Sequence, residues 1–192
     1  MAKKYEFRPD KSGKGLLSRL HLTQQQRKTL LKWVLYALFL TVTSVLQDVI
    51  LARLDIGGAT TDLVPCGIIL ITLAEGTDTG SVFALVASLL YLFSGTAPGP
   101  YAMVFITFLA VIVTAFRQAY LQKTFGAAML CTVVAVAVYE LAIFGIGLFL
   151  QVTTLKYLQA FLLTAGLTLV VAPLQYVFVR AINKIGGDLW TE

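Results

Sequence analysis

Long apolar stretches are the feature that most limits what this chain can fold into. A helix needs about 20 consecutive apolar residues to cross the hydrocarbon core of a bilayer. Three stretches reach that length: 33–54, 125–150 and 157–181. A fourth, 101–116, is borderline and could extend back through Pro98. Ten-residue segments of alternating hydrophobicity, typical of a membrane β-barrel, are absent. The pattern therefore predicts an all-α integral membrane protein.

Composition agrees with this class. Only 13% of the 192 residues are charged, whereas a soluble domain usually carries about 25%. Both cysteines, Cys66 and Cys131, lie within apolar runs, so we interpret them as small packing residues and expect neither a disulfide nor a metal site. The only histidine, His21, precedes the first long stretch, which excludes histidine-based catalysis and a histidine metal cluster inside the bundle.

Two further apolar runs, 63–74 and 81–93, are too short to cross a bilayer alone. They flank the polar segment EGTDTG at 75–80. We expect a hairpin of two short helices within a six-helix bundle, where surrounding helices satisfy its irregular backbone. Proline is expected to bend or break the helices at Pro65 and Pro173. The hinge candidates are Pro65, Glu75, Gly76, Asp78 and Gly95.

Basic residues predict the orientation. Nine of the fifteen Lys and Arg residues fall within 1–32, and six spans would place thirteen of the fifteen in the cytoplasm, together with both termini. We therefore expect a basic tail at 1–32, a transmembrane domain at 33–184 and a short tail at 185–192. The basic tail lacks zinc ligands and a recognition-helix pattern, so we expect no nucleic acid as a partner. We interpret the tail as a topology signal that also contacts anionic lipid.

A helix is expected to begin inside the basic tail. Thr23 and Gln26 have the spacing of a capping box. The helix would run along the membrane interface and enter the bilayer at Trp33.

Small residues and buried carboxylates are the candidate partner-binding groups. Gly80, Ala84 and Ser88 recur every four residues, a spacing that lets helix backbones approach in lipid. Asp48 and Glu140 each lie 15 residues into a long stretch, so both would sit roughly 22 Å above the cytoplasmic face. Ionisable residues at such depth indicate function. Two roles stay open for the carboxylates: binding a partner, or hydrogen bonding to a neighbouring helix or the outer interface.

Enzymatic motifs are missing from the sequence. It contains no Walker A loop, no nucleophile elbow and no histidine motif, so we expect no catalytic residues, no cofactor and no metal. Paired carboxylates could serve a proton-coupled transporter. Such transporters usually contain an internal repeat or paired broken helices, and no clear repeat is present.

Five short motifs, in this order and spacing, resemble the rod shape-determining protein MreD family over about residues 32–184. One position departs from the family pattern, because Tyr91 stands in a segment that often contains an Asp. The motifs are LQD at 46–48, DLVP at 62–65, EG at 75–76, Gly80, and LLYLFSG at 89–95.

The resemblance implies a non-enzymatic component of the bacterial inner membrane. A protein of this family would bind MreC, and through it MreB and the peptidoglycan synthases, and so support cell elongation and rod shape. The family fold is similar to the S component of energy-coupling-factor vitamin transporters. An S component is therefore the alternative function, although helix 1 offers only Ala37 and Thr41 as small residues for docking a transmembrane partner.

Overall fold

The chain forms a bundle of helices. The structure, a computed structural model, describes residues 24–49, 59, 61–121 and 124–185. The helices in this part are α1 (Gln24–Val49), α2 (Leu63–Glu75), α3 (Thr77–Phe93), α4 (Pro100–Tyr120), α5 (Phe125–Phe149), the short 3-10 helix η3 (Leu155–Tyr157) and α6 (Leu158–Ile185). No strand occurs among the described residues. The expectation of an all-α fold is confirmed.

Four helices, α1, α4, α5 and α6, are long and apolar enough to cross a membrane. The other two, α2 and α3, have 13 and 17 residues and match the two short runs of the sequence. Large apolar side chains remain exposed along the four long helices and along α3, among them Leu38, Phe108 and Val170. Because lipid is the medium that accommodates such surfaces, the fold is that of a multi-pass membrane protein.

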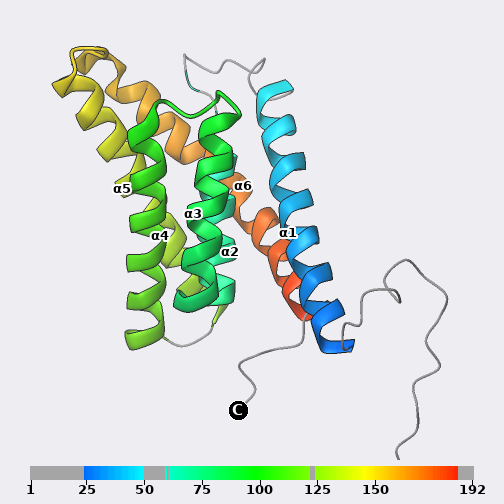
Figure 1. Cartoon of the computed structure of the whole chain (residues 1–192). Coiled ribbons are helices and arrows are strands. Elements are labelled where there is room, and N and C mark those ends of the chain that lie inside the picture. Colours follow the sequence, from blue (N-terminus) through cyan, green and yellow to red (C-terminus); the bar gives the residue numbers. More distant parts are fainter. Residues whose placement is uncertain (1–23, 50–58, 60, 122–123, 186–192) are drawn as a thin grey trace, which may run out of the picture.

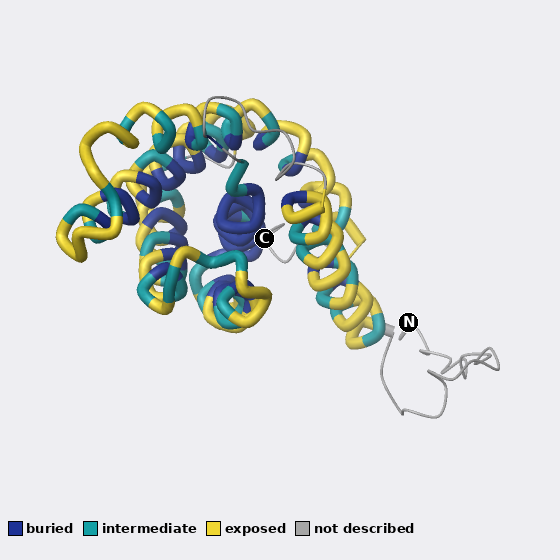
Figure 2. Tube along the Cα trace, turned by 90° about the horizontal axis from the view of Figure 1, so that it is seen from above, coloured by how far each residue is buried: buried dark blue, intermediate teal, exposed yellow. Residues whose placement is uncertain are grey.

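The short helix α2 forms the centre of the bundle. Every residue of α2 except Ala74 is buried, and α2 contacts each of the other five α-helices. Figure 2 shows its tube buried in the middle, with the other helices arranged around it. An apolar surface on all sides is typical of a helix that is fully enclosed.

The first residues of α1 and the last residues of α6 lie at the same end of the bundle, together with the α2–α3 turn (Figure 1). We call this the basic end, because the helix segments that lie there carry basic residues, namely Lys32 of α1, Arg117 of α4, and Arg180 and Lys184 of α6. The connections from α3 to α4 and from α5 to α6 lie at the opposite end.

Helix α1 begins inside the basic tail, as the sequence predicts. It starts at Gln24 and continues through Trp33 without interruption, so the expected interfacial segment and the first span form one helix. Thr23 of the predicted capping box, and residues 50–54 of the predicted span, lie outside the described residues.

Of the expectation that prolines bend or break the helices, the break is wrong for both. Pro65 lies in the first turn of α2, where a proline removes only an N–H that has no partner within the helix. Pro173 lies inside α6, which continues from Leu158 to Ile185. Neighbouring helices and local adjustments make such a proline tolerable in a membrane helix.

The turn between α2 and α3 is shorter than the six-residue hinge that the sequence predicts. Gly76 alone joins the helices, with φ 91° and ψ 179°, and its N–H donates to the Thr72 carbonyl at 3.0 Å. Positive φ favours glycine, which explains its place here. Glu75 is the last residue of α2 and Asp78 belongs to the first turn of α3. Gly95 follows α3 with φ 78°.

Candidate functional site

A buried ion pair joins α1 to the end of α2. Lys32 Nζ lies 2.7 Å from Glu75 Oε2, and the two residues are only 2% and 4% exposed. The Tyr36 hydroxyl donates to Glu75 Oε1 at 2.8 Å. Both carboxylate oxygens therefore have a donor, which a buried charge requires.

Aromatic rings cover this ion pair. The Trp33 ring lies 5.9 Å from Tyr36 and 5.5 Å from Phe83 of α3, measured between centroids. Tyr36 and Phe83 are themselves 5.9 Å apart. The cluster packs α1 and α3 together beside the pair, which limits access of water to it.

The last carbonyls of α2 accept hydrogen bonds from two other helices. Arg117 Nη1 of α4 donates to the Leu73 carbonyl at 2.7 Å, and Asn183 Nδ2 of α6 donates to the Ala74 carbonyl at 3.4 Å. The final carbonyls of a helix have no partner within it. Side chains of α1, α4 and α6 thus converge on one end of α2.

A cavity of about 510 Å³ opens beside this end of α2. It lies among α2, α4, α5 and α6, and its lining includes the basic residues Arg117, Arg180 and Lys184. The aromatic residues Phe125 and Tyr176 also line it, with their ring centroids 5.1 Å apart. The cavity therefore combines positive charge with an apolar wall.

The opposite end of α2 is held by a neutral side chain. Gln47 Oε1 of α1 accepts from the backbone N–H of Leu63 at 2.8 Å and from that of Val64 at 3.1 Å. Gln175 Nε2 of α6 donates to the Leu63 carbonyl at 3.0 Å. The side chain of Asp62, the N-cap residue of α2, makes no capping hydrogen bond. The Gln47 amide therefore serves as the cap of this helix.

Asp62 lies at the same end and is enclosed by polar groups. Its Oδ1 accepts from the Tyr91 hydroxyl at 3.0 Å and from Gln47 Nε2 at 3.2 Å. Its own N–H donates to Thr168 Oγ1 at 2.9 Å. Asp62 thereby links α1, α3 and α6 to the start of α2.

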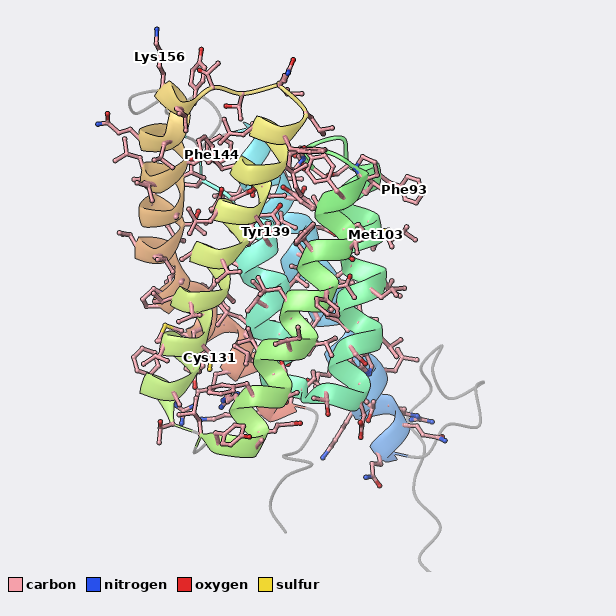
Figure 3. The ribbon with its side chains drawn as sticks, turned by 90° about the vertical axis from the view of Figure 1, so that its left-hand side faces the viewer. Phe93, Met103, Cys131, Tyr139, Phe144 and Lys156 are labelled. Atoms are coloured by element: carbon pink, nitrogen blue, oxygen red, sulfur yellow. The ribbon has the colours of Figure 1, made fainter. Side chains whose placement is uncertain are left out.

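Glu140 of α5 faces the interior near Asp62. It is 5% exposed, it lies close enough to Asp62 for their charges to interact, and its Oε1 has no hydrogen-bond partner in the described part of the chain. Figure 3 shows its neighbour Tyr139 on α5 between Cys131, which lies toward the basic end, and Phe144. Two carboxyl groups therefore share this region of the bundle.

The predicted partner-binding face of α3 lies inside the bundle. Gly80, Ala84 and Ser88 are all buried. A Cβ added at Gly80 would lie 2.9 Å from the Thr72 carbonyl oxygen of α2, and Ser88 Oγ lies 2.7 Å from Thr107 Oγ1 of α4. The small residues permit close packing of α3 within the protein, and binding of a partner at Gly80, Ala84 and Ser88 stays a prediction.

The two predicted membrane carboxylates occupy different environments. Asp48 is exposed on α1 and, among the described residues, accepts a hydrogen bond only from Ser44 Oγ, at 3.4 Å. Glu140 is buried. The sequence placed them at a similar depth, but depth does not fix the direction in which a helix presents a side chain. The residue beside Asp48, Gln47, is the one that enters the core.

Several residues of these contacts were not predicted as site residues: Lys32, Tyr36, Gln47, Asp62, Tyr91 and Arg117. A polar residue inside an apolar stretch is a sequence pattern that could have indicated a buried contact, and Gln47 fits this pattern. The pairing of Lys32 with Glu75 joins residues 43 positions apart, which no local pattern reveals. Within the described ranges, no group of three His, Cys, Asp or Glu side chains could hold a metal ion.

Fold and contacts define a class, a helical multi-pass membrane protein whose short central helix is held at both ends by polar side chains. The chain matches no family model, no curated protein and no solved structure at a significant level.

Proposed function

We propose that this protein is the MreD-type subunit of a bacterial cell-elongation complex in the inner membrane. It would act without catalysis, binding MreC and, through MreC, reaching MreB and the peptidoglycan synthases. The observation that carries the proposal is the way the motifs of the resemblance meet in space.

Four of those motifs lie at the two ends of α2. Gln47 of LQD accepts from the backbone N–H groups of Leu63 and Val64 in DLVP. Tyr91, from the LLYLFSG segment, donates to Asp62 at the start of DLVP. In the EG motif, Glu75 pairs with Lys32 and Gly76 forms the turn. Segments that are separated in sequence thus cooperate in one structural unit, which supports reading them together as a family signature.

The polar groups of this unit support a scaffolding role. Lys32, Glu75, Gln47 and Asp62 all have partners within the protein. Groups that hold helices together in this way fix the shape of the surface that a partner meets. A single-span partner would then pack its helix against the exposed apolar surface of the bundle, where association depends on close packing and polar contacts.

Six spans would place the basic end in the cytoplasm, in accord with the positive-inside rule. Both the start of α1 and the end of α6 lie at that end (Figure 1). Reporter fusions after Lys184 and after Lys123 are expected to read cytoplasmic, and fusions after Gly58 and Thr154 external. A cytoplasmic reading after Thr154 would contradict six spans.

A second candidate is the substrate-binding S component of a vitamin transporter. One observation favours it, because the Glu140 Oε1 atom is buried in the interior without a hydrogen-bond partner in the described part. A small ligand that donates a hydrogen bond could satisfy it. The likeness of the MreD fold to S components makes the two candidates compatible with one architecture.

Affinity purification from native membranes, with identification of the proteins retained, tests the proposal. We expect a single-span MreC-type protein to be retained, and depletion of the chain to turn rod-shaped cells round. Retention of an ATPase module together with a vitamin would instead establish the S component. Normal rod shape after complete depletion would contradict the MreD assignment.

A further inference from the structure

We propose that the cavity at the basic end binds the phosphate group of an anionic membrane amphiphile. This proposal does not depend on the function proposed above. It rests on the volume of the cavity, the charges that line it and the apolar surface next to those charges.

The charge of the cavity has no compensating carboxylate among the described residues. Arg180 and Lys184 lie four residues apart on α6 and therefore project from the same face. Neither makes an ion pair with any residue that the structure describes. No Asp or Glu lines the cavity in that part of the chain. Glu75, the nearest carboxylate in sequence to the lining residue Ala74, is already paired with Lys32.

Arg117 is held in place by the protein and keeps donors available. Its Nη1 donates to the Leu73 carbonyl, so the guanidinium is anchored to the end of α2. Its Nε is buried and has no acceptor in the described residues. A guanidinium has five N–H donors in a fixed plane, an arrangement that suits the oxygens of a phosphate. An anchored guanidinium loses less freedom on binding than a mobile one.

The α2 carbonyls do not oppose an anion at this site. The last carbonyls of a helix present partial negative charge. Here the Leu73 carbonyl accepts from Arg117, and the Ala74 carbonyl accepts from Asn183. Helix α5 begins beside the cavity, with Phe125 and Ala128 in its lining. The start of a helix carries partial positive charge.

The size and the walls favour an amphiphile over a bare ion. A volume of about 510 Å³ lies within the range typical of sites for small organic ligands. Apolar residues, among them Leu70, Leu121 and Phe125, line it beside the cations. Basic pockets between membrane helices at the cytoplasmic side are known to bind phospholipid head groups. A glycerophosphate head with the start of its acyl chains has this combination of charge and apolar surface.

The experiment uses the full chain in phosphatidylcholine nanodiscs, titrated with fluorescent phosphatidylglycerol. Arg180→Gln with Lys184→Gln is the main variant, because both side chains are exposed and their removal leaves the helix contacts intact. We expect phosphatidylglycerol to bind saturably, and the double variant to weaken binding about twenty-fivefold, from the contribution of each basic residue near a membrane surface. Equal thermal midpoints for variant and wild type show that the fold is retained.

Lys156→Gln provides the matched control for Lys184→Gln. Lys156 is an exposed lysine of η3, at the end of the bundle opposite the cavity, and does not line the cavity. We expect it to change the affinity less than twofold, and Lys184→Gln to lower it about fivefold. If inorganic phosphate displaces the fluorescent phosphatidylglycerol, the ligand is a soluble phosphate compound, recognised by its phosphate group alone. If inorganic phosphate does not displace it, the ligand is the lipid. Equal effects of the two lysine variants, or equal binding of phosphatidylglycerol and phosphatidylcholine, would overturn the proposal.

Discussion

At the basic end, α2 is held by the Lys32–Glu75 ion pair and by the Arg117 guanidinium. At the other end it is held by the neutral amide of Gln47, with Asp62 alongside. The difference follows the polarity of a helix. Carbonyls at the C-terminus need donors and favour cations, whereas N–H groups at the N-terminus need acceptors and favour anions. In a membrane, where water cannot serve, side chains of neighbouring helices supply both.

Removing one partner of the ion pair is expected to have the largest effect. Lys32→Met leaves the Glu75 carboxylate buried without its cation, which should lower the free energy of unfolding by about 3–5 kcal/mol. The measurement is unfolding of the purified protein in mixed micelles by a denaturing detergent.

The double variant Lys32→Met with Glu75→Gln is the control for this prediction. It removes both charges and keeps an acceptor for the Tyr36 hydroxyl, so it should recover most of the lost stability. A single variant Lys32→Met as stable as the wild type would show that the pair does not hold α2.

Close approach of α2 and α3 gives the next effect. In Gly80→Ala, the new Cβ would lie 2.9 Å from the Thr72 carbonyl oxygen, and separating the helices should cost about 1–3 kcal/mol. Gly166→Ala in α6 is the control, because a Cβ there has no atom within 4 Å. Thermal midpoints of the two variants measure the difference, and equal midpoints would disprove a tight α2–α3 contact.

The neutral cap should have a smaller effect than the ion pair. Gln47→Ala leaves the N–H groups of Leu63 and Val64 without their acceptor, at an expected cost of about 1–2 kcal/mol. Asp48→Ala changes the adjacent, exposed position and should stay within about 0.5 kcal/mol. Detergent-induced unfolding compares them; a larger loss for Asp48→Ala would contradict the assignment of Gln47 as the cap.

Glu140 should give the smallest effect, with the opposite sign. Glu140→Gln replaces a buried carboxyl by a neutral amide, which removes the cost of burying a charge and, to a smaller extent, repulsion from Asp62. We expect a gain of about 0–1 kcal/mol in the free energy of unfolding. A lower free energy of unfolding for Glu140→Gln than for the wild type would show that the carboxyl has a stabilising partner.

The sequence predicted the helical class, both short helices and a common end of the bundle for the start of α1 and the end of α6, because these depend on apolar run length and charge distribution. It did not predict where side chains point. Small residues at Gly80, Ala84 and Ser88 indicate that a helix approaches closely, but the pattern is the same for an internal neighbour and for a partner. Gln47 and Asp48 are adjacent, and only the packed bundle decides which one faces α2. The Lys32–Glu75 pair depends on long-range packing of α1.

Labelling from the lipid phase tests most directly whether α2 is the enclosed centre of the bundle. A lipid-soluble carbene precursor, activated by light in proteoliposomes, modifies side chains that face the acyl chains. The enclosed position of α2 predicts no label on Ile68, Ile69 and Ile71, which are fully buried, and strong label on Val86 and Leu90 of α3, which are exposed. Label on α2 as strong as that on α3 would contradict it.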